Sequence, residues 1–380
     1  MIAEPSRALL ITNIFPPHAG GPASFVDLLA HALTERGVRI SVICASDRQE
    51  EPSDKARPFR VRRVYWPARY TFEIKVRLVL LQEMLRHRVV FVNGLEAMVA
   101  PIARALGRRY ILKIVGDAVW ERARNLGATQ LSLDEFQTCA HAEVTWHRMR
   151  HERASYLAQA SRVIVPSRYL GKLVAGWGVP PTKLMMIENG TDVNMEKESE
   201  PPRQRKGVLR ALFVGRLTNW KGVETLLLAS QRLRDMHVTV CGDGPEYPML
   251  SALSLQLGLQ NRVSFLGRRP RAEVLALMRE AHVLVLTSLY EGMSHTALDA
   301  LASGLPCILS RCAGNEEVMS DGMHGMLIPP QDVDALQQAL ERIGTDEELR
   351  LRMAAAASKH SKRFPFSKTV DRYLEVMMNS

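Results

Sequence analysis

Apolar runs alternate with helical segments along the first half of the chain. An apolar run at residues 8–14 leads through a loop rich in proline and glycine, residues 15–22, into a helical pattern over residues 24–36 and a second apolar run at residues 38–44. A strand, a glycine-bearing loop, a helix and a strand in close succession are typical of a βαβ unit in a parallel sheet. Further strands are predicted at residues 89–92, 110–115 and 162–166. The first half is therefore predicted to be an α/β domain.

The same pattern returns after a polar segment. Residues 189–207 are rich in Pro, Glu, Lys and Arg, as exposed linkers are. A second series then begins with an apolar run at residues 209–214, and its later strands are predicted at residues 238–241, 263–266, 282–286 and 306–309. The predicted fold is α/β, with two Rossmann-like, doubly wound domains that face each other across a cleft.

The polar segment sets the predicted domain boundary. We assign residues 1–190 to an N-terminal domain and residues 191–363 to a C-terminal domain. The last helical segment, within residues 364–380, can pack back on the first domain or stay with the second. A length of 380 residues agrees with two domains, each large enough to bury its own core.

Composition excludes several classes of protein. The chain has 46% apolar and 24% charged residues, which is close to the average for soluble globular proteins. No apolar run approaches the length of a spanning helix, and no basic region precedes the first apolar run, so we expect neither a transmembrane helix nor a signal peptide and predict a cytoplasmic protein. Five scattered cysteines without a Cys-x-x-Cys pair argue against a disulfide framework and against a zinc site.

The loop after the first strand of the second domain holds two cations between glycines. Gly215, Arg216, Lys221 and Gly222 stand where a helix N-terminus and basic side chains can converge on a bound anion. A diphosphate fits this arrangement. The alternative is that Arg216 and Lys221 are solvated side chains of a surface loop, because no Walker or Gly-x-Gly-x-x-Gly spacing accompanies them.

Two carboxylates follow a later strand of the same domain. Glu291 comes directly after the strand, and Asp299 lies eight residues later on the next helix. Such a pair can accept hydrogen bonds from the vicinal hydroxyl groups of a sugar or ribose, while the amides at Ser294, His295 and Thr296 at the helix start can face phosphate oxygens. A sugar nucleotide offers both groups. The alternative is a strand end and a solvated helix face.

These features occur together with several further motifs, and here the chain resembles the retaining glycosyltransferases of family 4 (glycosyltransferase group 1), which have the two-domain GT-B fold. The resemblance covers nearly the whole chain, and several motifs in one order are more specific than any one of them. The matching segments are residues 15–21, 188–192, 215–222, 242–245, 265–267, 291–299 and 314–318.

The resemblance implies a role for each matching residue. In such enzymes the residues matching Arg216 and Lys221 hold the donor diphosphate, and the residue matching Glu291 lies beside the donor sugar. The remaining donor-binding positions are Asp299 at the ribose hydroxyls, the backbone of Gly267 and Arg268 at the base, and Gly20 and Gly21 in a loop that closes over the phosphates.

The sequence departs from the family in two places. Asp299 stands where the family most often has Glu, so the side chain is one methylene shorter. Many members have a His at the position that Val115 occupies here. Asp117 is then the nearest ionisable candidate for a sugar or acceptor hydroxyl. The alternative is that Asp117 caps the helix that carries Trp120 and Glu121.

The chemistry that these residues offer is stabilisation of a leaving nucleoside diphosphate, for which Arg216 and Lys221 are suited. No Cys-x-x-Cys pair is present, and the Asp-x-Asp and His-x-x-x-His spacings at residues 332–334 and 147–151 lie outside the matching segments, so we predict no cofactor and no metal. The resemblance also implies that the configuration at the anomeric carbon is retained. We count Glu291, Asp117, Arg216 and Lys221 as the candidate catalytic residues.

Positive charge gathers in the first half, which has 27 Lys and Arg against 17 Asp and Glu up to residue 190, compared with 23 against 23 after it. Residues 55–88 hold ten basic and two acidic residues, interleaved with aromatic and aliphatic ones. Such a segment can lie on an anionic membrane surface. The alternative is a helix that buries Leu78, Leu81 and Leu85 and has a solvated basic face. Nucleic acid is disfavoured because no binding motif accompanies the charge.

Three functions remain open. The first is transfer of a sugar from a UDP- or GDP-linked donor to a glycan or polyprenyl-linked acceptor in the synthesis of a cell-surface polysaccharide such as lipopolysaccharide, at the inner face of the plasma membrane. The second is a sugar-nucleotide 2-epimerase of the same fold, which needs no acceptor. The third is a non-catalytic member that binds a nucleotide or a partner protein.

Overall fold

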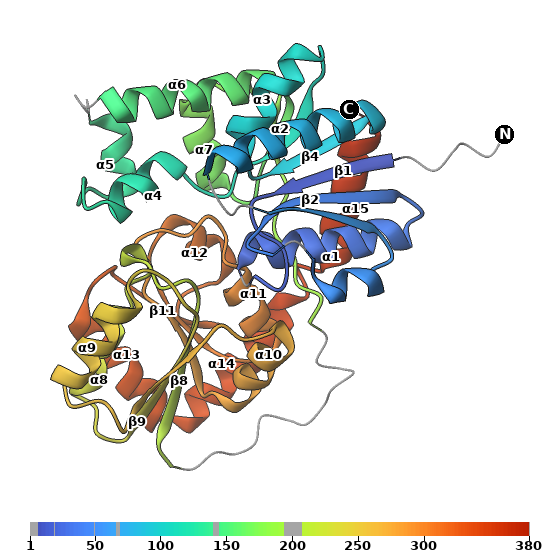
Figure 1. Ribbon diagram of the computed structural model, residues 1–380. Helices are drawn as coiled ribbons and strands as arrows, with labels where there is room; N and C mark the ends of the chain where they lie inside the picture. Colours follow the sequence, from blue (N-terminus) through green and yellow to red (C-terminus); the bar gives the residue numbers. More distant parts are fainter. Residues whose placement is uncertain are drawn as a thin grey trace. The chain divides into compact units, whose positions relative to one another are not determined.

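The computed structural model describes residues 7–18, 20–48, 50–65, 69–139, 144–193 and 207–379, and the chain divides into two compact units (Figure 1). The first unit consists of Met1–Val115, Ala140–Glu188 and Ser367–Ser380. The second consists of Gly116–Cys139 and Asn189–Phe366. Most of the predicted linker at residues 189–207 lies outside the described residues.

The first unit is built on a seven-stranded parallel sheet with the order β3-β2-β1-β4-β5-β6-β7. The predicted apolar runs are its central strands, which are buried on both faces as parallel strands are. The edge strands β3 and β7 were not predicted, because three of the six residues of β3 are arginines and β7 has only three residues. The strands are β1 (Arg7–Thr12), β2 (Arg39–Ser46), β3 (Arg60–Tyr65), β4 (Val89–Asn93), β5 (Tyr110–Lys113), β6 (Ala160–Val165) and β7 (Leu184–Met186).

Helices connect these strands. The helices are α1 (Gly21–Glu35), the short η1 (Pro52–Ala56), α2 (Arg69–Arg86), α3 (Glu96–Ala105), α6 (Val144–Gln159), α7 (Arg168–Gly176) and α15 (Phe366–Met378). Helix α15, near the end of the chain, packs on the first unit: the Tyr373 ring is fully buried, with centroids 5.4 Å from Phe25 and 5.5 Å from Phe91.

Helix α2 leaves an apolar stripe exposed. Its buried apolar positions are Val76, Leu80 and Met84. Four apolar side chains on another face of this helix are exposed, at a spacing of four, three and four residues. They are Ile74, Leu78, Leu81 and Leu85, with exposed fractions of 62%, 61%, 39% and 58%. The interpretation in which α2 buries Leu78, Leu81 and Leu85 is therefore wrong, because the four-residue repeat that packs inward starts at Val76.

The second unit has a six-stranded parallel sheet with the order β10-β9-β8-β11-β12-β13. The chain starts at β8, winds outward through β9 and β10, and returns to β11 on the other side of β8, so the strand order reverses between β8 and β11. Ligands of doubly wound sheets bind at the carboxyl ends of the strands at this reversal. The strands are β8 (Leu209–Val214), β9 (Met236–Cys241), β10 (Val263–Gly267), β11 (Val283–Leu286), β12 (Cys307–Ser310) and β13 (Gly325–Ile328).

The helices of this unit include a pair from the first half of the chain. The helices are α4 (Ala118–Asn125), α5 (Leu133–Thr138), η3 (Asn219–Lys221), α8 (Val223–Gln231), α9 (Tyr247–Gln256), α10 (Arg271–Glu280), α11 (His295–Ala302), α12 (Ala313–Val318), α13 (Val333–Thr345) and α14 (Glu347–Ser361). The sequence placed residues 116–139 in the first domain, whereas α4 and α5 belong to the second unit. The Trp120 ring lies 6.0 Å from Trp220 and 5.9 Å from Tyr290, and this aromatic packing joins α4 to the loops after β8 and β11.

Candidate functional site

The two loops at the strand reversal bring a cation and a carboxylate together. Lys221 ends η3 in the loop after β8, and Glu291 lies in the loop after β11. The Lys221 Nζ atom is 2.6 Å from Glu291 Oε1, and the Ser288 hydroxyl donates to the same oxygen at 2.7 Å. Both side chains are largely buried, with 21% and 11% of their surface exposed. The sequence selected both residues from separate motifs, and the fold pairs them.

Gly222 fixes the position of Lys221. Its φ is 68°, and a Cβ atom built there would lie 2.1 Å from the carbonyl oxygen of Thr287. The Thr287 hydroxyl in turn donates to the Gly222 carbonyl at 2.7 Å. Because both the left-handed conformation and this close approach exclude a side chain, the Lys221 loop is fastened directly to the end of β11.

Arg216 precedes η3 in the same loop. Its side chain is exposed, and it makes no ion pair or hydrogen bond with any residue that the structure describes. A guanidinium that forms no ion pair within the described chain, in the loop that also carries Lys221, is available to bind an anion. The two cations predicted to bind a diphosphate thus lie in one loop. They differ in pairing, because Lys221 forms an ion pair with Glu291 and Arg216 forms none within the described chain.

Helix α11 begins where the sequence predicts, and the Asp299 carboxylate already accepts hydrogen bonds from the protein itself. Ser294 is the N-cap of α11, and its hydroxyl accepts from the backbone amide of Ala297 at 3.2 Å, with His295 and Thr296 in the first turn. Asp299 accepts hydrogen bonds from Thr191 Oγ1 at 2.6 Å and from Arg271 Nη2 at 3.1 Å. Burial raises the pKa of Asp299, and the Arg271 guanidinium opposes that rise.

Arg271 was missed by the sequence analysis. It begins α10 and also pairs with Asp192 at 2.6 Å, so it bridges two carboxylates of the second unit. Its neighbour Arg268, which the sequence selected, is half-exposed and lies 3.2 Å from Asp243. Gly267 ends β10 with a φ of 68°. The contacts of Asp299, Gly267 and Arg268 with a nucleotide stay predictions.

Gly20 and Gly21 lie in the first unit at the start of α1. Gly20 is the N-cap, with a φ of 152°, and a Cβ atom there would lie 3.0 Å from the Ile14 Cδ1 atom. Gly21 is the first residue of the helix. Their contact with the phosphates of a donor stays a prediction.

Asp117 caps a helix. Its carboxylate is fully buried: Oδ1 accepts from the backbone amides of Val119 at 2.9 Å and Trp120 at 3.4 Å, and Oδ2 accepts from Gln137 Nε2 at 3.0 Å. The capping interpretation is confirmed. Because both oxygens are already satisfied by the chain itself, the catalytic role of Asp117 stays a prediction without further support.

Glu121, four residues on, is an ionisable group of the site that the sequence analysis did not select. It is half-buried in the first turn of α4, and its Oε1 atom lies 2.5 Å from where a Cβ atom on Gly116 would be, beside the Tyr290 ring. Within the described chain its carboxylate makes no hydrogen bond. Nothing in the local sequence sets this glutamate apart from those on other solvated helix turns.

The surroundings of Glu121 raise the pKa of its carboxyl group. Burial raises the pKa of Glu121 to about 7; Lys221 and Arg216 act to lower it, and Asp117 and Glu291 act to raise it. The second unit therefore brings two cations, Arg216 and Lys221, and two carboxylates, Glu121 and Glu291, to the carboxyl ends of β8 and β11. Perturbed titratable groups of this kind are common at functional sites.

The sequence models of two families divide the chain between them. The model of the glycosyl transferases group 1 matches residues 194–360, and the model of glycosyltransferase family 4 matches residues 19–195. The chain belongs to the family 4, group 1 glycosyltransferases. The matches include the loops that carry Arg216, Lys221 and Glu291.

Individual relatives agree with this membership. The D-inositol 3-phosphate glycosyltransferase of Corynebacterium efficiens is 29% identical, and the match covers 53% of this chain and 52% of that protein. The chain thus spans about half the length of this relative. The protein of the same name from Thermobifida fusca is 27% identical, with 93% of this chain and 87% of that protein covered.

A solved structure supports the fold. The Anabaena protein Alr3699/HepE, solved in complex with UDP and glucose, has a TM-score of 0.80 and 19% identity, and the match covers 99% of this chain and all of that one. This family 4 chain therefore has the GT-B fold, with two parallel-sheet, Rossmann-like domains as predicted.

The described part of this family 4 chain has no metal cluster, no disulfide and no membrane-spanning helix. Over the described ranges, no three His, Cys, Asp or Glu side chains gather in a way that could hold a metal ion. All five cysteines are free thiols. Among the helices that are described, none combines the length and the apolar character needed to cross a bilayer. Metal independence stays a prediction.

Proposed function

We propose that the protein transfers a sugar from a nucleotide-sugar donor, linked to UDP or GDP, to a glycan or polyprenyl-linked acceptor in cell-surface polysaccharide synthesis, with retention at the anomeric carbon. The observation that carries this proposal is the Lys221–Glu291 pair beside the unpaired Arg216 at the strand reversal. The family membership supports the reaction class, and the UDP and glucose bound to Alr3699/HepE support the donor class.

The proposed roles follow from charge. Negative charge develops on the diphosphate as its bond to the sugar breaks, and preorganised cations stabilise it. Arg216 supplies an unpaired cation, and Lys221 exchanges part of its interaction with Glu291 for the incoming phosphates. Glu291 stays in place through the Ser288 hydroxyl and is available to a sugar hydroxyl. The residues of the second unit therefore bind the donor, and the first unit is left to bind the acceptor.

The first prediction concerns which nucleotide binds. We expect one of UDP, GDP, ADP and CMP to raise the midpoint of thermal unfolding selectively, because a ligand at 100 times its Kd adds about 2.7 kcal/mol to the native state. The shift should vanish in Arg216→Ala and persist in Lys172→Ala, an exposed lysine on α7. A protein that none of the four stabilises would contradict donor binding. Conversion of a sugar nucleotide to its epimer without acceptor would replace the transferase with an isomerase.

The second prediction is metal independence. We expect transfer to proceed undiminished in EDTA, because side-chain cations and the α11 N-terminus supply the charge that Mg²⁺ would otherwise supply. The rate is measured as release of the nucleoside diphosphate from the donor selected above, with and without EDTA. Complete loss of turnover that Mg²⁺ or Mn²⁺ restores would refute this prediction.

We also propose that the protein works at the anionic inner face of the plasma membrane through residues 55–88. Residues 66–68 of this stretch lie outside the described residues. The support is α2, whose exposed stripe of Ile74, Leu78, Leu81 and Leu85 is bordered by the exposed cations Lys75, Arg77 and Arg86. An apolar face with basic borders is typical of interfacial helices.

The third prediction tests this membrane contact. We expect the double variant Leu78→Gln with Leu81→Gln to bind vesicles containing phosphatidylglycerol at least tenfold more weakly, because tenfold is about 1.4 kcal/mol and each buried methylene contributes about 0.8 kcal/mol. Sedimentation with vesicles at low salt measures the bound fraction. The matched control replaces Leu255 and Leu351 of the second unit, which have similar exposed fractions of 63% and 39%. Equal sedimentation of both variants would sink the role of α2.

A further inference from the structure

A basic cavity lies at the amino-terminal edge of the first sheet. It has a volume of about 380 Å³, and its lining includes Arg7, Arg39, Arg60, Arg86 and Glu83. The first three are the first residues of the neighbouring strands β1, β2 and β3, and Arg86 ends α2. In parallel sheets the ligand loops lie at the carboxyl ends of the strands, so this cavity is at the opposite edge from those loops.

The charge of this cavity is not balanced. Arg7 and Arg39 are direct partners in the register of β1 and β2, and like charges at adjacent strand positions repel. Neither side chain makes an ion pair or hydrogen bond within the described residues. Arg60 and Arg86 lie 3.4 and 3.6 Å from the buried Glu83. Arg62, which is outside the lining, donates to the same carboxylate at 2.8 Å, so the four lining arginines share one carboxylate with a fifth.

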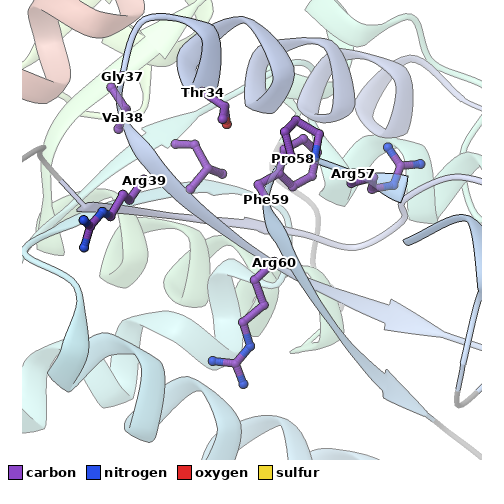
Figure 2. Close-up of a pocket in the computed structure, with 9 residues that line it drawn as sticks. Thr34, Gly37, Val38, Arg39, Arg57, Pro58, Phe59 and Arg60 are labelled. Atoms are coloured by element: carbon purple, nitrogen blue, oxygen red, sulfur yellow. The ribbon is translucent and has the colours of Figure 1, made fainter. Parts of the chain in front are cut away.

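A neighbouring cavity shares part of this lining and shows which cavity holds the excess positive charge. It has a volume of about 460 Å³ and shares Arg39 and Arg60, and it adds Arg57, Pro58 and Phe59 (Figure 2). Arg57 is neutralised, because it pairs with Asp27 and with Asp54. In Figure 2 the side chains of Arg39 and Arg60 extend away from the helix that carries Thr34. The uncompensated cations therefore belong to the smaller cavity.

We propose that this cavity binds the phosphate of an anionic lipid headgroup. Guanidinium groups bind phosphate through paired hydrogen bonds, and an anion between Arg7 and Arg39 would relieve their repulsion. A lipid is favoured over a free phosphate because Arg86 lies next to Leu85, which belongs to the exposed apolar stripe of α2. The headgroup and the acyl region of one bilayer leaflet would thus contact adjacent parts of one surface. This inference deepens the membrane contact proposed above.

The test uses the full chain and the double variant Arg7→Gln with Arg39→Gln. Its affinity for vesicles of phosphatidylcholine and phosphatidylglycerol is expected to fall about 30-fold, because each cation near an anionic surface contributes about 1 kcal/mol. Glycerol 3-phosphate should compete with vesicles for the wild-type protein and not for the variant. The matched control, Lys172→Gln with Lys368→Gln, removes the same charge from exposed positions on α7 and α15.

The outcomes separate the pocket from the proposed function. Removal of two like-charged neighbours should leave the unfolding midpoint unchanged or higher, and stabilisation by the donor nucleotide should persist, so a loss of vesicle binding reports the pocket. Equal vesicle binding of variant and control would contradict lipid binding by this cavity and would leave the proposed contact of α2 with the membrane untouched. Binding of glycerol 3-phosphate without any vesicle binding would overturn the lipid as ligand, and binding of neither would overturn both.

Discussion

Replacing Lys221 by alanine is expected to abolish stabilisation by the donor nucleotide and to lower the transfer rate by about 10²–10³-fold, the usual effect of deleting one group that stabilises transition-state charge. The substitution removes a cation and also exposes the diphosphate to the Glu291 carboxylate, which Lys221 neutralises across 2.6 Å. Thermal unfolding with the nucleotide and the rate of nucleoside diphosphate release measure the two effects. A variant that still binds the nucleotide and transfers the sugar like the wild type would show that Lys221 has no role in donor binding.

A double-mutant cycle separates the two contributions. In Lys221→Ala with Glu291→Gln the repulsive carboxylate is gone, so nucleotide binding should partly recover relative to Lys221→Ala alone. Transfer should stay low, because Glu291 is also proposed to contact the sugar. Glutamine keeps an oxygen that can accept the Ser288 hydroxyl. Additive losses in nucleotide binding would show that the two side chains act independently, in disagreement with their pairing.

Local pattern was sufficient to predict the central strands and the motif residues. Continuous apolar runs predicted β8 and β11, and the glycines and cations between Gly215 and Gly222 predicted that the loop after β8 binds an anion, which stays a prediction. The pairing of Lys221 with Glu291 was not predictable, because these residues are 70 positions apart. They meet because β11 returns to the side of β8, which depends on the strand order of the whole sheet.

The assignment of α4 and the role of Glu121 were missed for a related reason. The segment 116–139 follows β5 in the chain, so sequence order places it in the first domain. Its packing is decided by Trp120 against Trp220 and Tyr290, which are distant in sequence. The environment of Glu121 is created by that packing. An ordinary glutamate in a first helical turn thereby becomes a group that titrates near pH 7.

Glutamine at position 121 is expected to remove a pH dependence of donor binding. Burial raises the pKa of Glu121 to about 7 in the free protein, and a diphosphate nearby adds negative charge that raises it further. Binding of UDP-glucose, whose diphosphate does not titrate near neutrality, should therefore take up a proton and weaken as pH rises through 7. In Glu121→Gln both effects should vanish. Calorimetric titration in two buffers with different ionisation enthalpies measures the proton uptake.

The same substitution should change stability without any ligand. Because the pKa of Glu121 is higher in the folded than in the unfolded chain, its contribution to stability is fully present below about pH 4 and is lost as pH rises through 7. Glu121→Gln should thus be more stable than the wild type at pH 8, by about 1–3 kcal/mol, and should lose most of this advantage at pH 5. Lys221, Arg216, Glu291 and Asp117 face the carboxyl in both states of protonation, so Glu224→Gln, an exposed glutamate of α8, controls for the general loss of a charge. Urea unfolding at the two pH values measures the difference, and an equal effect of both substitutions would show that Glu121 titrates as an ordinary surface carboxyl.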